Sequence, residues 1–465
     1  MGFVLSVLYF IAYYLGPSVV FGPLANFRIM LILAVLIFVI SLPKMMGSFL
    51  SDTPQSLALA GLSLTVFLSI LIAVRWFAGA ASAFIEFIPC VYAYFLICLH
   101  CDSIKKLKII VFMLLFICLF VMAHGVFDLL HGIPAGSPEI SSVNTRADIH
   151  LWNAQHPYVL PMRDDNGAWF YRIRGLAEIN DPNDFAQLLA AVIPLLFFTW
   201  KPKRTFTNTL FILLPASILL YGIFLTHSRG GLLALVVVVV FASRRRFGTI
   251  PALVMAGAIF IGAMALRFTG GRAISAGSGS DRTNLWSQGL TMVKENPLFG
   301  VGFGRFGQYA SNTAHNTIVV CAAEIGLVGL FCWSLFLFPT LRDVFLIASP
   351  TKVGEPVEEV QEKKHYSQRS VTADILDKGE VNRYGWAIAL SLVGFLSAGW
   401  FLSRAFVMTL FMLGGMAESV YQMARKQGMV GPRLSMAQCL RYTLGFMVLS
   451  VTLVYAILRV LNLTR

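Results

Sequence analysis

Charged side chains are scarce in this chain, and long apolar runs dominate it. Of its 465 residues only 13% are Asp, Glu, Lys or Arg, about half the share of an ordinary soluble domain, whereas 57% are hydrophobic. This composition excludes a soluble globule. Stretches of roughly 18–25 apolar residues recur, each long enough to cross about 30 Å of hydrocarbon as a helix. We therefore predict an all-α, polytopic transmembrane helical bundle, because helices satisfy their own backbone hydrogen bonds in lipid.

The sequence also lacks the patterns of several other protein classes. The seven cysteines do not form the even, loop-borne set of a secreted disulfide framework. Cys98 and Cys101 have the spacing of a metal pair, but no second pair accompanies them, so we assign no metal. There is no Rossmann-like domain, no Asp-x-Asp motif and no internal repeat. We expect no cofactor, and we expect the lipid bilayer, not nucleic acid, as the partner.

The apolar runs predict about 12–13 spans. The predicted spans are 3–22, 25–42, 56–74, 80–99, 108–130, 184–200, 208–226, 230–243, 250–267, 315–341, 385–402, 405–421 and 441–461. The first run begins almost at Met1 without a basic segment or cleavage site, and we interpret it as a retained span. The residues around Arg404 fit either a hairpin of two helices or one long broken helix.

Four short basic clusters define the predicted orientation. They lie at 105–108, 201–204, 244–246 and 425–433, and all fall on one side of the predicted spans, which is then the cytoplasmic side. The chain is thereby divided into N-terminal transmembrane helices (1–130), an external loop (131–183), a core (184–341) with a second external loop at 268–314, an internal loop (342–383) and C-terminal transmembrane helices (384–465). We interpret the internal loop, rich in mixed charge, as a solvated tether.

The second external loop carries positive charge where membrane insertion disfavours it. Its charged residues are Arg267, Arg272, Arg282, Lys294 and Arg305 against Asp281 and Glu295, a net charge of +3. Guanidinium groups bind phosphate oxygens bidentately, so a lipid diphosphate at the membrane surface is one ligand that offsets this cost. The alternative is that these arginines pair with lipid headgroups or with the acidic residues of loop 131–183. The charge pattern alone does not separate the two.

His315 stands at the mouth of a predicted span, after a polar run. A neutral imidazole accepts a proton near neutral pH, which suits a general base, although an isolated interfacial histidine is more often structural. Glu324 lies nine residues further on, about 13 Å along a helix and on its opposite face, so we expect no direct contact with His315. We interpret the stretch from Glu324 to Gly329 as a helix-packing segment and the glycines between 300 and 304 as a flexible external turn.

Taken together, these motifs resemble a known family. Ser228-Arg229-Gly230-Gly231, then Arg282 with Trp286 and the glycine-rich 296–304 segment, then His315-Asn316 with the 324–329 segment, are similar in order and spacing to the O-antigen ligase and polymerase superfamily of bacterial envelope glycosyltransferases. The resemblance covers roughly 170–340. It implies a multi-pass protein of the bacterial inner membrane, which transfers a glycan from an undecaprenyl-diphosphate carrier to an acceptor hydroxyl at the periplasmic face, with inversion and without a metal.

The resemblance also implies roles for single residues. Arg229 and Arg282 would bind the diphosphate, and His315 would activate the acceptor. We expect secondary contributions from Arg272, Arg305 and Trp286. The acceptor is a glycan, the lipid A core or a protein hydroxyl, and these three possibilities share one donor site. Sugar identity and oligomeric state stay open.

Two other classes of membrane protein compete with a glycosyltransferase. A transporter or flippase of lipid-linked glycans also needs basic residues, but it predicts charges along a midplane cavity and an internal repeat. A purely structural membrane subunit does not explain the external arginines.

The first external loop has two further features. Its aromatic residues, Trp152, Tyr158, Trp169, Phe170 and Tyr171, fit either interfacial anchors or platforms that stack on sugar rings. Asn183 is the expected N-cap of the helix that follows, outside the catalytic set.

Overall fold

The computed structural model describes residues 1–20, 28–46, 53–132, 156–163, 169–265, 268, 276–349 and 376–463. Helices dominate this part of the chain, which confirms the predicted all-α polytopic class. In chain order the helices are α1 (Gly2–Leu15), α2 (Pro17–Val20), α3 (Ile29–Met46), α4 (Pro54–Val74), α5 (Phe77–His100), α6 (Ile104–Phe127), α9 (Pro182–Leu195), α10 (Thr205–Asn208), α11 (Leu214–Thr226), α12 (Arg229–Phe247), α13 (Thr249–Ala265), α14 (Ala276–Glu295), α15 (Phe306–Tyr309), α16 (Thr317–Ile347), α17 (Lys378–Gly399), α18 (Met408–Lys426) and α19 (Met436–Leu463). Short turns extend some of them: η3 (Asp128–Gly132) follows α6, η4 (Ala177–Ile179) precedes α9, η5 (Leu196–Thr199) follows α9 and η6 (Thr209–Leu213) joins α10 to α11.

Each predicted span overlaps a helix within the described residues. Eight described segments are long and apolar enough to cross a membrane, and they correspond to α3, α4, α5, α6 with η3, α9 with η5, α10 to α11, α16 and α19. The other predicted spans fall on α1, α12, α13, α17 and α18, which are shorter or carry more polar residues. The total of 12–13 spans and the boundaries of the loops stay predictions.

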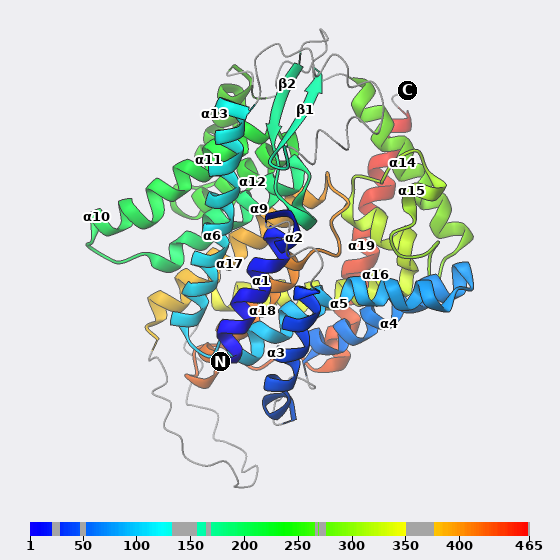
Figure 1. Cartoon of the computed structure of the whole chain (residues 1–465), viewed down its shortest axis with the longest axis horizontal. Coiled ribbons are helices and arrows are strands. Elements are labelled where there is room, and N and C mark those ends of the chain that lie inside the picture. Colours follow the sequence, from blue (N-terminus) through cyan, green and yellow to red (C-terminus); the bar gives the residue numbers. More distant parts are fainter. Residues whose placement is uncertain are drawn as a thin grey trace.

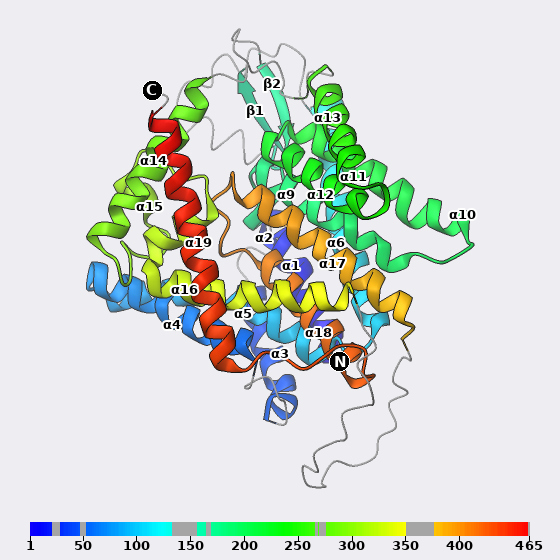
Figure 2. The same cartoon turned by 180° about the vertical axis from the view of Figure 1, so that it is seen from behind.

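Helix α16 lies at the centre of the bundle. It packs against α4, α17, α18 and α19, and its first turns contact α14 (Figures 1 and 2). Helices α9 and α12 pack on the other side of α17. A second, smaller core joins α14 to the C-terminal part of α19, where Leu285 and Trp286 pack with Val454 and Leu458. This core holds α14 against the end of the bundle.

A short β-hairpin interrupts the first external loop. Strands β1 (Val159–Arg163) and β2 (Trp169–Ile173) pair antiparallel with Val159 opposite Ile173. Figure 1 shows the hairpin and α14 at the same end of the molecule, with the N-terminus towards the opposite end. The sequence predicted only a loop for these residues. The strands are five residues each and lack a regular alternation of apolar and polar residues, which leaves no recognisable strand pattern.

The four basic clusters gather at one end of α17. Lys108 Nζ lies 5.8 Å from the ring centroid of Tyr384. Arg245 Cζ lies 5.0 Å from the ring centroid of Trp386. Phe198, just before the 201–204 cluster, stacks on Tyr384, and Gln427, inside the 425–433 cluster, accepts a hydrogen bond from the amide of Leu376. All four contacts lie near the N-terminal end of α17. Its C-terminal end at Gly399 is about 20 Å further along the helix axis, a large part of the thickness of a bilayer core.

Candidate active site

A cleft opens at the C-terminal end of α17. It has a volume of about 440 Å³, and its walls are one face of α14 and the segment that precedes α16. Helix α14 contributes Arg282, Leu285 and Gln288, which share a face because they are spaced three residues apart. His315 and Asn312 line the opposite wall. The structure therefore brings together two of the three main residues that the sequence singled out.

Arg282 is half-buried, and its guanidinium lies 5.7 Å from the ring centroid of Phe401. Among the side chains that the structure describes, no carboxylate forms an ion pair with it. Burial lowers the pKa of Arg282, and the positive charge of Arg229 lowers it further. Two guanidiniums thus lie close enough to repel each other, an arrangement that a bound dianion would stabilise.

Arg229 is the first residue of α12, and the turn before it is tightly held. The hydroxyl of Ser228 accepts a hydrogen bond from the amide of Gly231 at 3.2 Å and donates one to Asn183 Oδ1 at 2.8 Å. Gly231 is required by close packing, since a Cβ at this position would lie 2.6 Å from that of Ala186. The start of α12 is therefore fixed against the start of α9. A Cβ at Gly230 would lie 3.6 Å from that of Phe401, the residue that contacts Arg282, so the first turn of α12 lies near this side of the cleft.

A buried arginine completes this support. Arg172 on β2 donates from Nε to the carbonyl oxygen of Thr226 at 2.7 Å and from Nη2 to Asn183 Oδ1 at 3.0 Å. A role for Arg172 was not predicted from the sequence. The only indication of it there is a basic residue within an apolar stretch. The prediction that Asn183 caps α9 was wrong. The N-cap is Asp181, whose Oδ1 accepts the amide hydrogen of Asn183 at 2.7 Å, because Pro182 occupies the first helical position and sets the start of the helix there.

His315 has an unusual backbone conformation for a residue with a side chain. Its φ is +49°, and its amide donates a hydrogen bond to Ser403 Oγ at 2.9 Å. The next residue, Asn316, caps α16 by accepting hydrogen bonds from two backbone amides. Burial lowers the pKa of His315, the charge of Arg282 lowers it further, and Asp181 acts in the opposite direction. The net shift is downward from the usual 6.5, so the imidazole is neutral at pH 7 and able to accept a proton.

The segment between α17 and α18, residues 400–407, holds the site together, and we call it the α17–α18 linker. Phe401 lies beneath Arg282, and Ser403 supports His315. Thr317 donates to the carbonyl oxygen of Leu402 at 2.9 Å. Two separate helices, α17 and α18, lie on either side of the linker. The residues around Arg404 therefore join a hairpin of two helices and do not form one long broken helix.

Arg404, in the same linker, forms a buried ion pair with Asp184 of α9. Arg404 Nε donates to Asp184 Oδ1 at 2.6 Å, and Arg404 Nη2 contacts Asp184 Oδ2. Asp184 is 5% exposed and Arg404 29%. Sequence reasoning did not assign either residue to the site. The signal was one charged residue at the edge of each of two apolar runs, which indicates an internal partner but not its identity.

The secondary residues lie outside the cleft or outside the described part of the chain. Trp286 is buried, donates from Nε1 to the carbonyl oxygen of Ala314 at 2.9 Å, and packs edge-on against Trp400. Its contacts are those of a support for the loop before α16. Arg305 donates from Nε to Gln308 Oε1 at 2.7 Å and is not among the residues that line the cleft. Arg272 lies outside the described residues.

The glycine-rich turn is held in place by a break in α16. Gly326 has φ 70° and ψ −174°, and the amides of Leu327 and Val328 bond to the carbonyl oxygens of Pro297 and Leu298 instead of continuing the helix. The flexible turn that the sequence suggested is thus tied to α16 by backbone hydrogen bonds. As predicted, Glu324 makes no contact with His315.

Glu324 instead anchors the turn from inside the helix. Its carboxylate accepts the amide hydrogens of Gly304 at 3.0 Å and Phe306 at 3.1 Å. The glycine-rich turn is therefore held by α16 at both of its ends. The residues that connect this turn to α16, including His315, start from a fixed position.

Two aromatic residues of the first external loop pack within the protein. Tyr158 stacks on His124 with ring centroids 4.9 Å apart, and Phe170 meets His227 edge-on at 5.4 Å. Trp152 lies outside the described residues. Within the described part of the chain, no group of three or more His, Cys, Asp or Glu side chains is arranged to hold a metal ion.

The fold and the cleft define a polytopic membrane protein with a basic, histidine-containing site at the end of its bundle opposite to its basic clusters. Residues 214–334 match the family model described as O-antigen ligase. This match confirms the predicted resemblance over this segment and supports a membrane glycosyltransferase of the ligase or polymerase type. The matched segment contains Arg229, Arg282 and His315, whereas Asp184 and the α17–α18 linker lie outside it. No curated protein matches the sequence significantly.

Proposed function

We propose that this chain transfers a glycan from an undecaprenyl-diphosphate carrier to an acceptor hydroxyl at the periplasmic face of a bacterial inner membrane. The observation that carries the proposal is the pairing, in one cleft, of a half-buried cation with a neutral histidine, with a second guanidinium close by. The position of the cleft, at the opposite end of α17 from the four basic clusters, supports an outward-facing site.

The proposed chemistry follows from these side chains. The imidazole of His315 takes the proton of the acceptor hydroxyl, and the resulting oxygen nucleophile attacks the anomeric carbon of the donor sugar from the side opposite to the diphosphate. A new glycosidic C–O bond forms as the bond between the anomeric carbon and the diphosphate oxygen breaks, so the configuration inverts. Arg229 and Arg282 neutralise the charge that grows on the leaving diphosphate, and His315 then releases its proton to water.

No metal is needed in this scheme, because guanidiniums supply the positive charge that a divalent cation supplies in other transferases. Metal independence is therefore part of the proposal. Ligation to the lipid A core, polymerisation of repeat units and transfer to protein hydroxyls all begin from the same donor complex and differ only in the acceptor.

The test is a transfer assay with purified protein in lipid, an undecaprenyl-diphosphate-linked repeat unit and a metal chelator. A ladder of longer carrier-linked glycans without added core indicates a polymerase, and a single transfer that requires the lipid A core indicates a ligase. Arg229→Ala, Arg282→Ala and His315→Ala should insert normally and lose about a hundred- to a thousandfold in rate. Full activity of His315→Ala would remove the base assignment. Movement of the carrier across the bilayer without any covalent product would indicate a transporter.

A further inference from the structure

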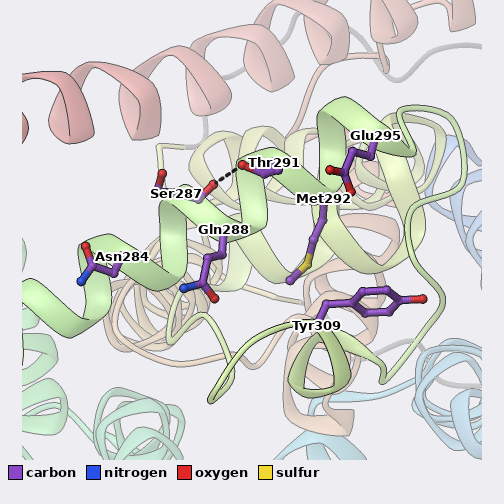
Figure 3. Close-up of a pocket in the computed structure, with 7 residues that line it drawn as sticks. All are labelled: Asn284, Ser287, Gln288, Thr291, Met292, Glu295 and Tyr309. Atoms are coloured by element: carbon purple, nitrogen blue, oxygen red, sulfur yellow. Dashed lines mark hydrogen bonds between the residues drawn. The ribbon is translucent and has the colours of Figure 1, made fainter.

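A second hollow of about 480 Å³ lies beside the first on the surface of α14 (Figure 3). The two hollows share Asn284 and Gln288. The second continues along the helix through Ser287 and Thr291 to Glu295, and Tyr309 of α15 stands across from it. From Arg282 to Glu295 the two hollows follow α14 for about 20 Å. The cleft is therefore one end of a longer groove.

The two parts of this groove differ in chemistry. The cleft contains Arg282 and His315, whereas the second hollow is lined by amides, hydroxyls, the thioether of Met292 and an aromatic ring, and the single charge among its lining residues is the carboxylate of Glu295. A carboxylate repels phosphate and other anions. The second hollow is thus unsuited to the diphosphate and open to an uncharged polar ligand.

These groups match the surface of a sugar. Amides and hydroxyls offer both donors and acceptors, so they fit a polyhydroxylated ring. Tyr309 is 52% exposed, so its flat ring offers an apolar surface to the C–H side of such a sugar, beside the guanidinium of Arg305, which lies 5.9 Å from the ring centroid. Asn284, Ser287, Gln288 and Thr291 are all exposed on one side of α14, so they can be reached without rearrangement of the core.

We infer that the second hollow is a subsite for neutral sugar residues of a glycan whose reacting end lies in the cleft. This inference rests on the proposed function and adds to it a binding site for the part of the glycan remote from the bond that forms. Binding energy from this remote part would hold the reacting end next to His315. The glycan belongs either to the donor or to the acceptor, and the two sources share the chemistry that the hollow recognises.

The test uses Tyr309→Ala, which removes the aromatic face, and Tyr309→Phe, which keeps it. The matched control is Lys294→Ala, an exposed residue of α14 outside the hollow. In lipid nanodiscs we would record saturation-transfer NMR with the neutral oligosaccharide of the repeat unit, free of carrier and phosphate. We expect signal with wild type, Tyr309→Phe and Lys294→Ala, and a loss of about tenfold in affinity with Tyr309→Ala.

Binding should persist in His315→Ala, which separates this inference from the proposed transfer reaction. If wild type transfers glycan but the oligosaccharide does not bind, or binds Tyr309→Ala equally well, the subsite is overturned and the proposed function stands. If the oligosaccharide binds in the Tyr309-dependent manner and no transfer occurs, the subsite stands and the proposed function fails. In the transfer assay, a KM raised about tenfold by Tyr309→Ala for the donor alone assigns the hollow to the donor glycan. The same rise for the acceptor alone assigns it to the acceptor, and no rise for either overturns the inference.

Discussion

The backbone amide of His315 donates a hydrogen bond to the hydroxyl of Ser403, 88 residues further along the chain. The same α17–α18 linker packs Phe401 beneath Arg282 and pairs Arg404 with Asp184. Residues of α9, of α14 and of the segment before α16 thus all contact one short linker. The linker lies outside the segment that matches the O-antigen ligase family, yet it determines the geometry of the residues inside that segment.

Removal of the Ser403 hydroxyl should misplace His315 without removing it. For Ser403→Ala we expect kcat to fall about fivefold, since a hydrogen bond worth about 1 kcal/mol no longer holds a residue with positive φ. The KM for the donor should change little, because Arg229 and Arg282 are untouched. Ser403→Thr keeps the hydroxyl and should retain most of the rate. Single-turnover transfer rates measure the effect, and a wild-type rate in Ser403→Ala would contradict it.

The pKa of His315 should lie below the usual 6.5 and should respond to two charges in opposite directions. Arg282→Gln removes a cation and should raise the pKa of His315, whereas Asp181→Asn removes an anion and should lower it further. Asparagine is also a good N-cap, so Asp181→Asn should leave α9 intact. NMR titration of labelled histidine, with His315→Gln for assignment, provides the measurement.

The same shift sets the acid limit of activity. Because a lowered pKa keeps the imidazole neutral to a lower pH, transfer should fall as His315 becomes protonated, with the acid limb of the pH profile centred below 6.5. An acid limb centred above 6.5 would show that His315 is not the base or that Arg282 does not act on it.

We expect the buried ion pair between Asp184 and Arg404 to stabilise the fold, because removal of one residue leaves the charge of the other without its partner. Arg404→Ala leaves an unpaired buried carboxylate and should cost about 3 kcal/mol, with Asp184→Ala similarly destabilising. The double variant with both alanines should lose less stability than the sum of the two single variants, because no charge is then left unpaired in the interior. Thermal unfolding in detergent over the full double-mutant cycle tests this. Additive losses would mean that the two residues do not interact.

Gly326→Ala should disrupt the turn in front of the site. A Cβ at this position would overlap the carbonyl oxygen of Leu298, and its φ of 70° is unfavourable for alanine. We expect a loss of at least about 2 kcal/mol of stability and of most activity, from the combined overpacking and backbone strain. Gly257→Ala is the matched control, since Gly257 lies in α13 and a Cβ there meets nothing within 4 Å. Gly257→Ala should be neutral or stabilising by about 0.5–1 kcal/mol. Equal behaviour of the two variants would refute the argument.

Some features were accessible from sequence for identifiable reasons. The helices follow from runs of apolar residues, and Arg282 and His315 could be grouped because both belong to the motifs that resemble the O-antigen ligase family. Trp286 was correctly noticed, but its aromatic ring alone did not distinguish a buried support from a substrate contact. The cap of α9 was misplaced by two residues, because Asp181 and Asn183 are both good caps and only the geometry around Pro182 separates them.

The sequence by itself determined that the chain is a helical membrane protein, because apolar run length is a local property. Charge placement, which is also local, predicted that a group of positive charges and the candidate base His315 lie on the external side. Only the tertiary structure decided which partners hold them. The contacts of Asn183 with Ser228, of Ser403 with His315 and of Asp184 with Arg404 join residues 45 to 220 positions apart. Such contacts depend on how the helices pack, and helix packing leaves no periodic pattern in any one segment of the sequence.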